Sequence, residues 1–459
     1  MSKMRFDETE IKESLLPIKE LDKNMYEYLL EKIEFNRLQR FKKASRQMIR
    51  RYLARGMREY QKRISINDII SIINRPSSKK KILYVSALPT FNLVRQSIYL
   101  RKTGEFETIL LMESPWLGEF TEKYFDTVYV YSSCYSLANI LKEVNPYIIH
   151  VLGCSFYSEF HGVLSRILND CAVIFEFYDV ASLCVNKEDP DAAKVWGKMN
   201  VELMVFSERF VCERCDGIIL GYSPEALGIL KNRHNTKVPM LEFHAYACDR
   251  FSSHENGKYL NMDGKIHLVM GGSVSPTDAP NKFFGDSKYL GLIEKITAQG
   301  ICFDIYYSPH FSPTKAKKKY WDYLLMAQKN PLFKFEKGVP PDEVTKIFSM
   351  YDFGTMVSFF HQGTFLDVHN HNRLPGRLFT YLEAGLPMIV SEEMQYLSRI
   401  IKEYEIGIVV SQKDLDNLPV IINSYDREKL KTNVKRAREE LSMKRHIKRL
   451  VAFYEEVHG

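Results

Sequence analysis

The residues of this sequence best suited to chemistry are a glycine turn and a basic side chain at the start of one predicted helix. In the stretch RLPGRLFTYLEAGLPMIV, residues 373–390, Pro375 and Gly376 predict a turn, and Arg377 falls in the first turn of the helix that follows. Backbone amides at a helix N-terminus attract anions, and an arginine adds a bidentate positive charge. The stretch is therefore typical of a phosphate-binding site. Arg373 either helps to bind the phosphate or lies on the surface.

The rest of the same stretch predicts the helix and the strand that would position this phosphate-binding site. Large apolar residues recur at helical spacing through residues 374–382 and predict an amphipathic helix. Gly385 and Pro387 end that helix, and the β-branched residues after them predict a short buried strand. Any helix-to-strand junction of a doubly wound sheet shows the same pattern, so the stretch alone leaves an ordinary structural role open.

A second glycine pair follows another predicted strand, residues 265–272. Gly271 and Gly272, with Ser273 after them, would let backbone amides approach a pyrophosphate, and Lys282 follows in the same loop region. This loop lacks a Gly-x-Gly-x-x-Gly fingerprint, and the chain lacks a Gly-Lys-Ser/Thr phosphate loop. Both absences disfavour a dinucleotide-dependent oxidoreductase and a P-loop nucleotide hydrolase.

Strand-like and helix-like segments alternate from residue 81 to residue 411. Such alternation predicts mostly parallel sheets covered by helices on both faces. The turn-rich segment 244–265 divides the alternation into two successive sets. The predicted strands are residues 81–86, 108–112, 127–131, 147–152, 171–177 and 216–221 in the first set, and 265–272, 301–307, 332–338, 353–360, 387–391 and 407–411 in the second.

The expected fold class is therefore α/β, with two tandem Rossmann-like doubly wound domains and a helical N-terminal extension. The expected limits are a basic helical extension at residues 1–78, a first Rossmann-like domain at 79–250, a second at 260–430 and a C-terminal helix at 431–459. A chain of 459 residues has room for domains that each bury a core of their own.

Composition describes a mildly basic globular protein, with 45% hydrophobic residues and a formal net charge of +7. The eight cysteines are scattered, and Cys212 and Cys215 form the only Cys-x-x-Cys pair, so neither a disulfide framework nor a structural zinc site is expected. No long apolar run or signal peptide is evident. We expect a cytoplasmic protein, with peripheral binding at the inner face of a membrane as an open alternative.

The basic charge is concentrated in residues 37–63, where Glu59 is the only acid and an apolar side recurs at helical spacing. Such a helix could lie on an anionic membrane, dock an acidic protein or bind a lipid-linked phosphate. A solvated helix packed on its own protein would have the same sequence pattern. Nucleic acid is not expected as a partner, because no recognisable nucleic-acid-binding module surrounds the segment.

Several segments, taken in order over residues 80–457, resemble the GT-B glycosyltransferases of the group 1, or family 4-like, type. They are YIIHV, EFYDV, CERCDGIILGYSPEAL, MYDFGTMVSFF and the stretch around Arg377, followed by a C-terminal helix with Phe453 and Tyr454 that looks like the family's helix crossing back to the first domain. The resemblance implies transfer of a sugar from a nucleoside-diphosphate donor, held by the second domain, to a glycan, lipid-linked or protein acceptor held by the first. It implies no cofactor, and no metal is expected at the donor site.

The resemblance also implies which residues act. Arg377 matches the family's basic residue for the pyrophosphate, and Asp179 matches an aspartate of the first domain that faces the cleft. If the enzyme inverts, the general base is expected among Asp179, Glu176 and His161; if it retains, the donor phosphate can take the proton. The expected donor-binding residues are Gly271, Gly272, Ser273, Lys282, His371, Asn372, Arg373, Gly376, Thr380 and Glu383.

The chain departs from the family pattern at two positions. Many retaining members carry two glutamates where this chain has Asn372 and Thr380, and Glu383 is a shifted carboxylate in the same helix. The segment 361–376, with His361, His369 and His371 among its polar residues, reads as a loop facing the donor sugar. These departures leave open a catalytically silent scaffold or partner subunit, and a GT-B-fold epimerase.

Overall fold

The computed structural model describes residues 12–31, 33, 64–87, 90–113, 119–131, 133–153, 160–253, 259–309, 313–359 and 367–459. The predicted basic helix 37–63 and His361 lie outside these residues. Within the described part of the chain, no helix is both long enough and apolar enough to cross a lipid bilayer.

The described chain forms two compact units. Unit 1 consists of the chain up to Leu220 together with residues 227–243 and 449–459, and unit 2 consists of residues 221–226 and 244–448. Helices α14 (Pro224–His234) and α26 (Met443–His458) each contribute residues to both units.

Unit 1 is built on a seven-stranded sheet in the order β3-β2-β1-β4-β5-β6-β7, in which every neighbouring pair is parallel. The central strands are buried along their whole length, as a sheet covered on both faces requires. The strands are β1 (Lys80–Ser86), β2 (Phe106–Met112), β3 (Thr127–Val130), β4 (Ile148–Gly153), β5 (Val173–Phe177), β6 (Gly217–Leu220) and β7 (Met240–Glu242).

Helices separate these strands along the chain, as the alternating pattern predicts. Ser65 caps α6 (Ile66–Asn74) in a reciprocal capping box with Asp68, which fixes where that helix begins. The other helices that lie wholly in unit 1 are α2 (Leu16–Leu21), α7 (Phe91–Thr103), α8 (Glu119–Glu122), α9 (Cys134–Glu143), α10 (Phe160–Leu168), α11 (Ala181–Cys184), α12 (Pro190–Trp196) and α13 (Lys198–Arg214).

The last residues of the chain complete the core of unit 1. The hydroxyl of Tyr454, on α26, lies 2.6 Å from Nδ1 of His150 on β4, and both side chains are fully buried. Gly217 on β6 admits this helix, because a Cβ there would lie 2.8 Å from Val457 and 3.0 Å from Phe453. The end of α26 therefore belongs to the packing of the first sheet.

Unit 2 contains a second all-parallel sheet in the order β10-β9-β8-β11-β12-β13. The order reverses between β8 and β11, and ligands of doubly wound sheets bind at the carboxyl ends of the strands at such a switch point. The strands are β8 (His267–Gly272), β9 (Cys302–Tyr307), β10 (Phe333–Lys337), β11 (Phe353–Met356), β12 (Met388–Ser391) and β13 (Gly407–Val410).

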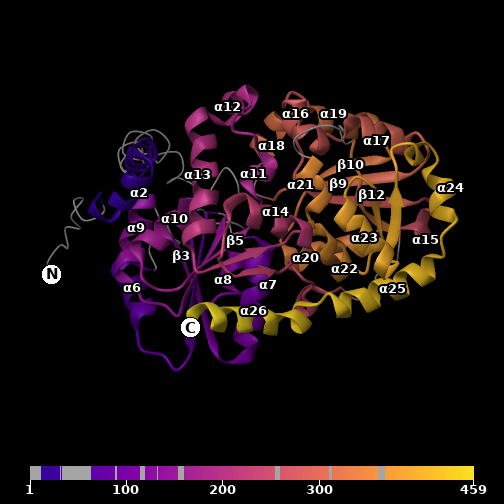
Figure 1. Ribbon diagram of the computed structural model, residues 1–459. Coiled ribbons are helices and arrows are strands. Elements are labelled where there is room, and N and C mark those ends of the chain that lie inside the picture. Colours follow the sequence, from indigo (N-terminus) through magenta and orange to yellow (C-terminus); the bar gives the residue numbers. More distant parts are fainter. Residues whose placement is uncertain are drawn as a thin grey trace. The chain divides into compact units, whose positions relative to one another are not determined.

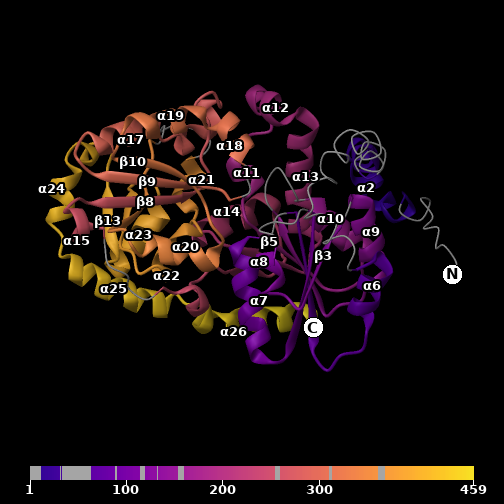
Figure 2. The ribbon, with the colours of Figure 1, turned by 180° about the vertical axis from the view of Figure 1, so that it is seen from behind.

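Helices cover both faces of this sheet. In Figures 1 and 2, α17 and α19 lie on one side of β9 and β10, while α20, α22 and α23 lie on the other. The helices of unit 2 are α15 (Leu260–Asp263), α16 (Asn281–Phe284), α17 (Leu290–Thr297), α18 (Pro313–Lys319), α19 (Trp321–Lys329), α20 (Pro341–Phe348), α21 (Asp367–Asn372), α22 (Arg377–Glu383), α23 (Gln395–Tyr404), α24 (Leu418–Asn423) and α25 (Arg427–Glu440).

The α/β doubly wound prediction is confirmed, and three local predictions need correction. Residues 367–372, expected to lie in a loop, form α21. Helix α22 is not amphipathic, since residues 378–383 are all buried. Strand β7 was not predicted, because its three half-exposed residues are too few to show a period.

Candidate functional site

The carboxyl ends of β8, β11 and β12 form the polar rim at the switch point of the second sheet. Gly271 and Gly272 close β8, Ser358 follows β11, and Ser391 ends β12. The stretch 373–390 enters the same rim through α22, which precedes β12 in the chain. The residues expected from the sequence to bind a phosphate therefore come from the end of β8 and from the start of α22, which lies between β11 and β12 in the chain.

Gly272 and Arg377 are in direct proximity. Gly272 has φ +129°, which L-residues rarely adopt, and a Cβ at this position would lie 3.6 Å from Cδ and 3.8 Å from Nε of Arg377. The arginine stem thus lies along bare backbone at the end of β8. A positive charge beside a strand end that carries no side chain is an arrangement that suits a pyrophosphate.

Tyr381 fixes the helix that carries Arg377. Its ring packs over Gly354 of β11, where a Cβ would lie 2.5 Å from the ring. Its hydroxyl donates to the carbonyl oxygens of Val269, at 3.3 Å, and Thr355, at 3.1 Å. Burial raises the pKa of Tyr381 to about 12, although the charge of Arg377 opposes that rise. The phenol therefore stays a neutral donor that ties α22 to two strands.

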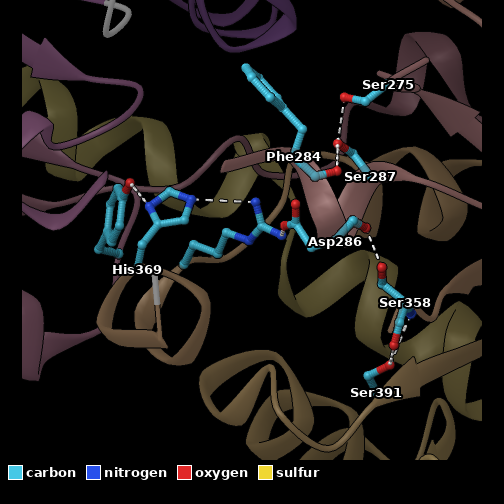
Figure 3. A network of polar contacts seen from close by, with 9 residues as sticks. Ser275, Phe284, Asp286, Ser287, Ser358, His369 and Ser391 are labelled. Atoms are coloured by element: carbon cyan, nitrogen blue, oxygen red, sulfur yellow. Dashed lines mark hydrogen bonds and ion pairs between the residues drawn. The ribbon is translucent and has the colours of Figure 1, made fainter. Parts of the chain in front are cut away.

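A second arginine is held in a chain of polar contacts shown in Figure 3. Nη1 of Arg373 lies 3.3 Å from Nε2 of His369, and Nη2 lies 3.3 Å from the carboxylate of Asp286. Nδ1 of His369 lies 2.9 Å from the hydroxyl of Tyr222. Nε of Arg373 is buried without a hydrogen-bond partner among the described residues. Its guanidinium is therefore held at both Nη atoms, while Nε–H makes no hydrogen bond to the described residues.

These contacts define the protonation state of His369. An arginine can only donate, so Nε2 of His369 accepts and carries no proton. Burial, followed by the charge of Arg373, lowers the pKa of His369 well below its ordinary value, so the ring is neutral. Its single proton then lies on Nδ1, which donates to Tyr222.

This neutral histidine predicts a pH dependence of stability. The pKa of His369 is lower in the folded state, so the unfolded chain takes up the proton first as the pH falls through about 6.5. Folded stability should therefore fall between about pH 7 and about pH 5, and His369→Gln should remove that component from urea unfolding curves. His371→Gln, at a half-exposed histidine of the same helix, should keep it. An identical slope in wild type and His369→Gln would contradict the assignment.

Serines connect the strand ends to the segment after α16. The hydroxyl of Ser287 donates to the carbonyl oxygen of Phe284 at 3.0 Å and therefore accepts from the hydroxyl of Ser275 at 2.7 Å. The hydroxyl of Ser358 donates to the backbone carbonyl of Asp286. Ser391 accepts from the amide of Ser358 at 3.1 Å. Hydrogen bonds within the protein itself therefore hold the rim together.

Asn372 makes hydrogen bonds that join helix α21 to the backbone and side chain of Ser223. Its side-chain oxygen accepts from the hydroxyl of Ser223 at 2.5 Å, its side-chain nitrogen donates to the carbonyl of Val368 at 2.7 Å, and its own carbonyl accepts from the Ser223 amide at 2.9 Å. Thr380 is only 6% exposed within α22. The structure therefore gives Asn372 a structural role, while donor contacts by these two residues and by half-exposed His371 remain predictions.

Glu383 also makes hydrogen bonds within the protein. It is 1% exposed, and its carboxylate accepts from the backbone amide of Cys248 at 2.7 Å, while its carbonyl accepts from the amide of Ser253 at 2.9 Å. These bonds hold the segment 248–253 against the end of α22. The geometry favours a structural role over the predicted contact with a ribose.

We expect Glu383→Ala to destabilise the protein without abolishing nucleotide binding. The substitution leaves the buried amide of Cys248 without an acceptor, which should lower the free energy of unfolding by about 1–3 kcal/mol. Urea unfolding and nucleotide titration of the same samples measure the two effects. Glu403→Ala, at an exposed position of α23, is the control and should change neither. Normal stability with lost nucleotide binding would restore the ribose contact.

The remaining donor candidates lie on the surface of unit 2. Ser273 is exposed just after β8, and Lys282 is exposed on α16, with its ammonium 5.8 Å from the ring of Phe283. Gly376 caps the start of α22 with φ −57°, and a Cβ at this position would meet no atom within 4 Å. A side chain at position 376 would therefore meet open space, while the amides of Leu378 and Phe379 donate to the carbonyls of Pro375 and Gly376.

In unit 1, Asp179 follows β5 and is half-exposed, directly after Tyr178, which is 44% exposed. Buried Glu208 supports the next turn by accepting from the amide of Ser182 at 2.7 Å. The two other base candidates are buried: Glu176 accepts from His150 at 3.0 Å, and His161 lies 3.3 Å from the hydroxyl of Tyr131. Only Asp179 of the three has solvent access.

Sequence reasoning missed part of the rim. None of Tyr222, Asp286, Ser358 and Ser391 was expected to act, although Tyr222 and Ser358 fall in segments that resemble the family. Tyr222 is far from Arg373 in the chain, but the backbones of the two residues pair in the fold. The serines gave one usable signal, since each lies near the carboxyl end of a predicted strand. Nothing in the sequence around Asp286 indicates its contact with Arg373.

Comparison with known proteins agrees with this architecture. Residues 322–453 match the family model described as "Glucosyltransferase 3-like, C-terminal domain". No curated protein sequence matches the chain. Among solved structures, sucrose-phosphate synthase from Thermosynechococcus elongatus is similar with a TM-score of 0.56 and 13% identity, covering 83% of this chain and 99% of that one.

Two further solved structures are similar at lower scores. TcCGT1 in complex with UDP has a TM-score of 0.46 and 10% identity, covering 83% of this chain and 100% of that one. MurG of Acinetobacter baumannii has a TM-score of 0.40 and 10% identity, covering 82% of this chain and 99% of that one. The two parallel sheets, the matched C-terminal family and the similarity to the synthase together identify the chain as a protein with the GT-B glycosyltransferase fold.

Proposed function

We propose that the protein is a glycosyltransferase that takes its sugar from a nucleoside-diphosphate donor held at the rim of the second sheet. The observation that carries the proposal is the placement of Arg377 along Gly272, at the switch point of a GT-B fold. The match of residues 322–453 to a glucosyltransferase-like domain supports the same reaction class. Glucose is the sugar that this family description suggests first.

In the proposed reaction, the bond between the sugar's anomeric carbon and the diphosphate oxygen breaks, and an acceptor oxygen bonds to that carbon. Negative charge develops on the departing diphosphate, and in this proposal Arg377 at the end of β8 stabilises it. The acceptor's proton goes to the carboxylate of Asp179 if the enzyme inverts, or to the departing phosphate if it retains. Neither route needs a cofactor or a metal ion.

A second candidate function is a scaffold of the same fold that does not transfer sugar. It is favoured by the structural use of Asn372 and Glu383, whose side chains hold Ser223 and Cys248. The two candidates differ at the rim: an enzyme must bind the donor nucleotide, whereas a scaffold need not.

A thermal-shift screen tests the proposal. Ligands that bind only the folded state raise the melting temperature, so UDP, GDP, CMP, ADP and their common sugar conjugates should include one clear responder. That responder should then support slow hydrolysis or transfer of its sugar. No response from the well-folded protein to any nucleotide would overturn the donor site and favour the scaffold.

We further propose that residues 37–63 bring the protein to an anionic membrane or lipid-linked acceptor. Because the neighbouring Leu15, Ile18 and Leu29 are buried, deletion of the whole N-terminal region would disturb the fold, and charge reversal is the better test. Arg50→Glu with Arg51→Glu should reduce sedimentation with anionic liposomes. The same reversal at Lys435 and Arg436, exposed on α25, is the control. Unchanged sedimentation of the first variant would remove this proposal.

A further inference from the structure

Three potential metal ligands meet at the amino-terminal edge of the second sheet. Nε2 of His267 lies 3.1 Å and 3.2 Å from the two carboxylate oxygens of Asp263. The thiol sulfur of Cys302 joins them, so that one donor atom of each residue lies within 4.8 Å of the others. The cluster is at the start of β8, whereas the proposed donor site is at the end of that strand.

The sheet fixes two of these ligands. His267 and Cys302 are register partners on the adjacent parallel strands β8 and β9, so their side chains start from neighbouring points of a rigid ladder. The backbone amide of His267 donates to Asp352 at 2.8 Å, and the ring of Tyr259 lies 4.9 Å from the imidazole. Ligands carried by paired strands keep their spacing better than ligands carried by loops.

The position of Asp263 is fixed by the end of a helix. It is the last residue of α15, Gly264 after it has φ +74°, and the amide of Lys265 donates to its carboxylate at 2.9 Å. The carboxylate side chain is 44% exposed, while His267 and Cys302 are 7% and 8% exposed. The cluster thus has two buried ligands and one ligand that opens to solvent, which gives an ion both a site and an entry path.

The donor set selects the metal. A thiolate, an imidazole and a carboxylate suit Zn²⁺, which binds sulfur, nitrogen and oxygen ligands in tetrahedral sites, whereas Mg²⁺ and Ca²⁺ prefer oxygen alone. We propose that Asp263, His267 and Cys302 bind one Zn²⁺, with solvent as the fourth ligand, at the edge of the second sheet opposite the donor site. Closing the ligands around an ion would tie α15, β8 and β9 together. This proposal does not depend on the glycosyltransferase activity.

Cobalt titration of the full-length protein tests the site directly. Co²⁺ substitutes for Zn²⁺ in tetrahedral sites, and its visible bands report four-coordination while a near-ultraviolet charge-transfer band reports a thiolate ligand. We expect both bands in the wild type, and we expect Zn²⁺ to displace them at one equivalent. Cys302→Ser should lose the charge-transfer band, whereas Cys171→Ser, at a half-buried thiol of unit 1, should keep it.

A second variant protects the test against misfolding. Asp263→Asn changes an exposed side chain and should weaken Zn²⁺ binding by at least the roughly 10-fold to 100-fold that outer-shell changes produce. Zn²⁺ should also raise the melting temperature of the wild type more than that of either ligand variant. Absence of the cobalt bands in the folded wild type, or their full retention in Cys302→Ser, would overturn the proposal.

Discussion

Arg377→Ala should abolish the response of the protein to its donor nucleotide and lower sugar transfer by about 100-fold or more, which is the effect of removing one group that stabilises developing negative charge. The side chain lies along Gly272 at the end of β8, where a departing diphosphate would sit. Arg377→Lys should recover part of the activity, since lysine keeps the charge but not the bidentate geometry. Initial rates with the donor found by thermal shift measure both variants.

The matched control is Arg399→Ala in the same unit. Arg399 makes an exposed bidentate pair with Glu225, with distances of 2.8 Å and 3.0 Å, and exposed pairs contribute at most about 1 kcal/mol. Its loss should leave both nucleotide binding and transfer unchanged. If Arg377→Ala folds normally and transfers sugar at the wild-type rate, the assignment of the pyrophosphate site is wrong.

Gly272→Ala should damage the same site through the backbone. A residue held at an unfavourable positive φ costs about 1–3 kcal/mol, and the new Cβ would lie 3.6 Å from Cδ of Arg377. We expect a lower free energy of unfolding and a nucleotide affinity at least about tenfold weaker, because a loss of about 1.4 kcal/mol in binding corresponds to a factor of ten. Urea unfolding and nucleotide titration measure the two quantities.

Gly376→Ala is the comparison that separates strain from recognition. Gly376 has φ −57° and open space where its Cβ would stand, so alanine should keep or slightly raise stability, by up to about 1 kcal/mol. Weaker nucleotide binding by this stable variant would place the phosphate over the start of α22. Full stability and affinity in Gly272→Ala would contradict the proposed role of the β8 end.

The fold was predictable because its signals are local and repeated. Apolar strand segments recur between helical segments, and both sheets form with the expected parallel pairing. Gly385 ends the helix before β12 with φ +69°, as its position after the apolar run predicts. Strand β7 and helix α21 escaped prediction because each is short and depends on its neighbours for its structure.

The site was predictable only in part. The proximity of Gly272 to Arg377 was predictable, because the carboxyl end of a strand and the start of a helix that leads into a parallel strand lie at the same edge of the sheet. The roles of Asn372 and Glu383 could not be predicted, because their hydrogen-bond partners, Ser223 and Cys248, are more than a hundred residues away in the chain. A polar side chain near a ligand motif has the same sequence signature whether it binds the ligand or holds the protein.

The position of Tyr454 has a consequence for the biosynthesis of the protein. Its contact with His150 spans 304 residues, so the ribosome must make all of unit 2 before the first sheet can bury that histidine in its final environment. Contacts with such long sequence separation slow folding and prolong the life of incomplete states. Nascent unit 1 therefore cannot complete its core until residues 449–459 have been synthesised. Truncation before residue 449 should give a product prone to aggregation and degradation, although the strands of both sheets precede that point in the chain.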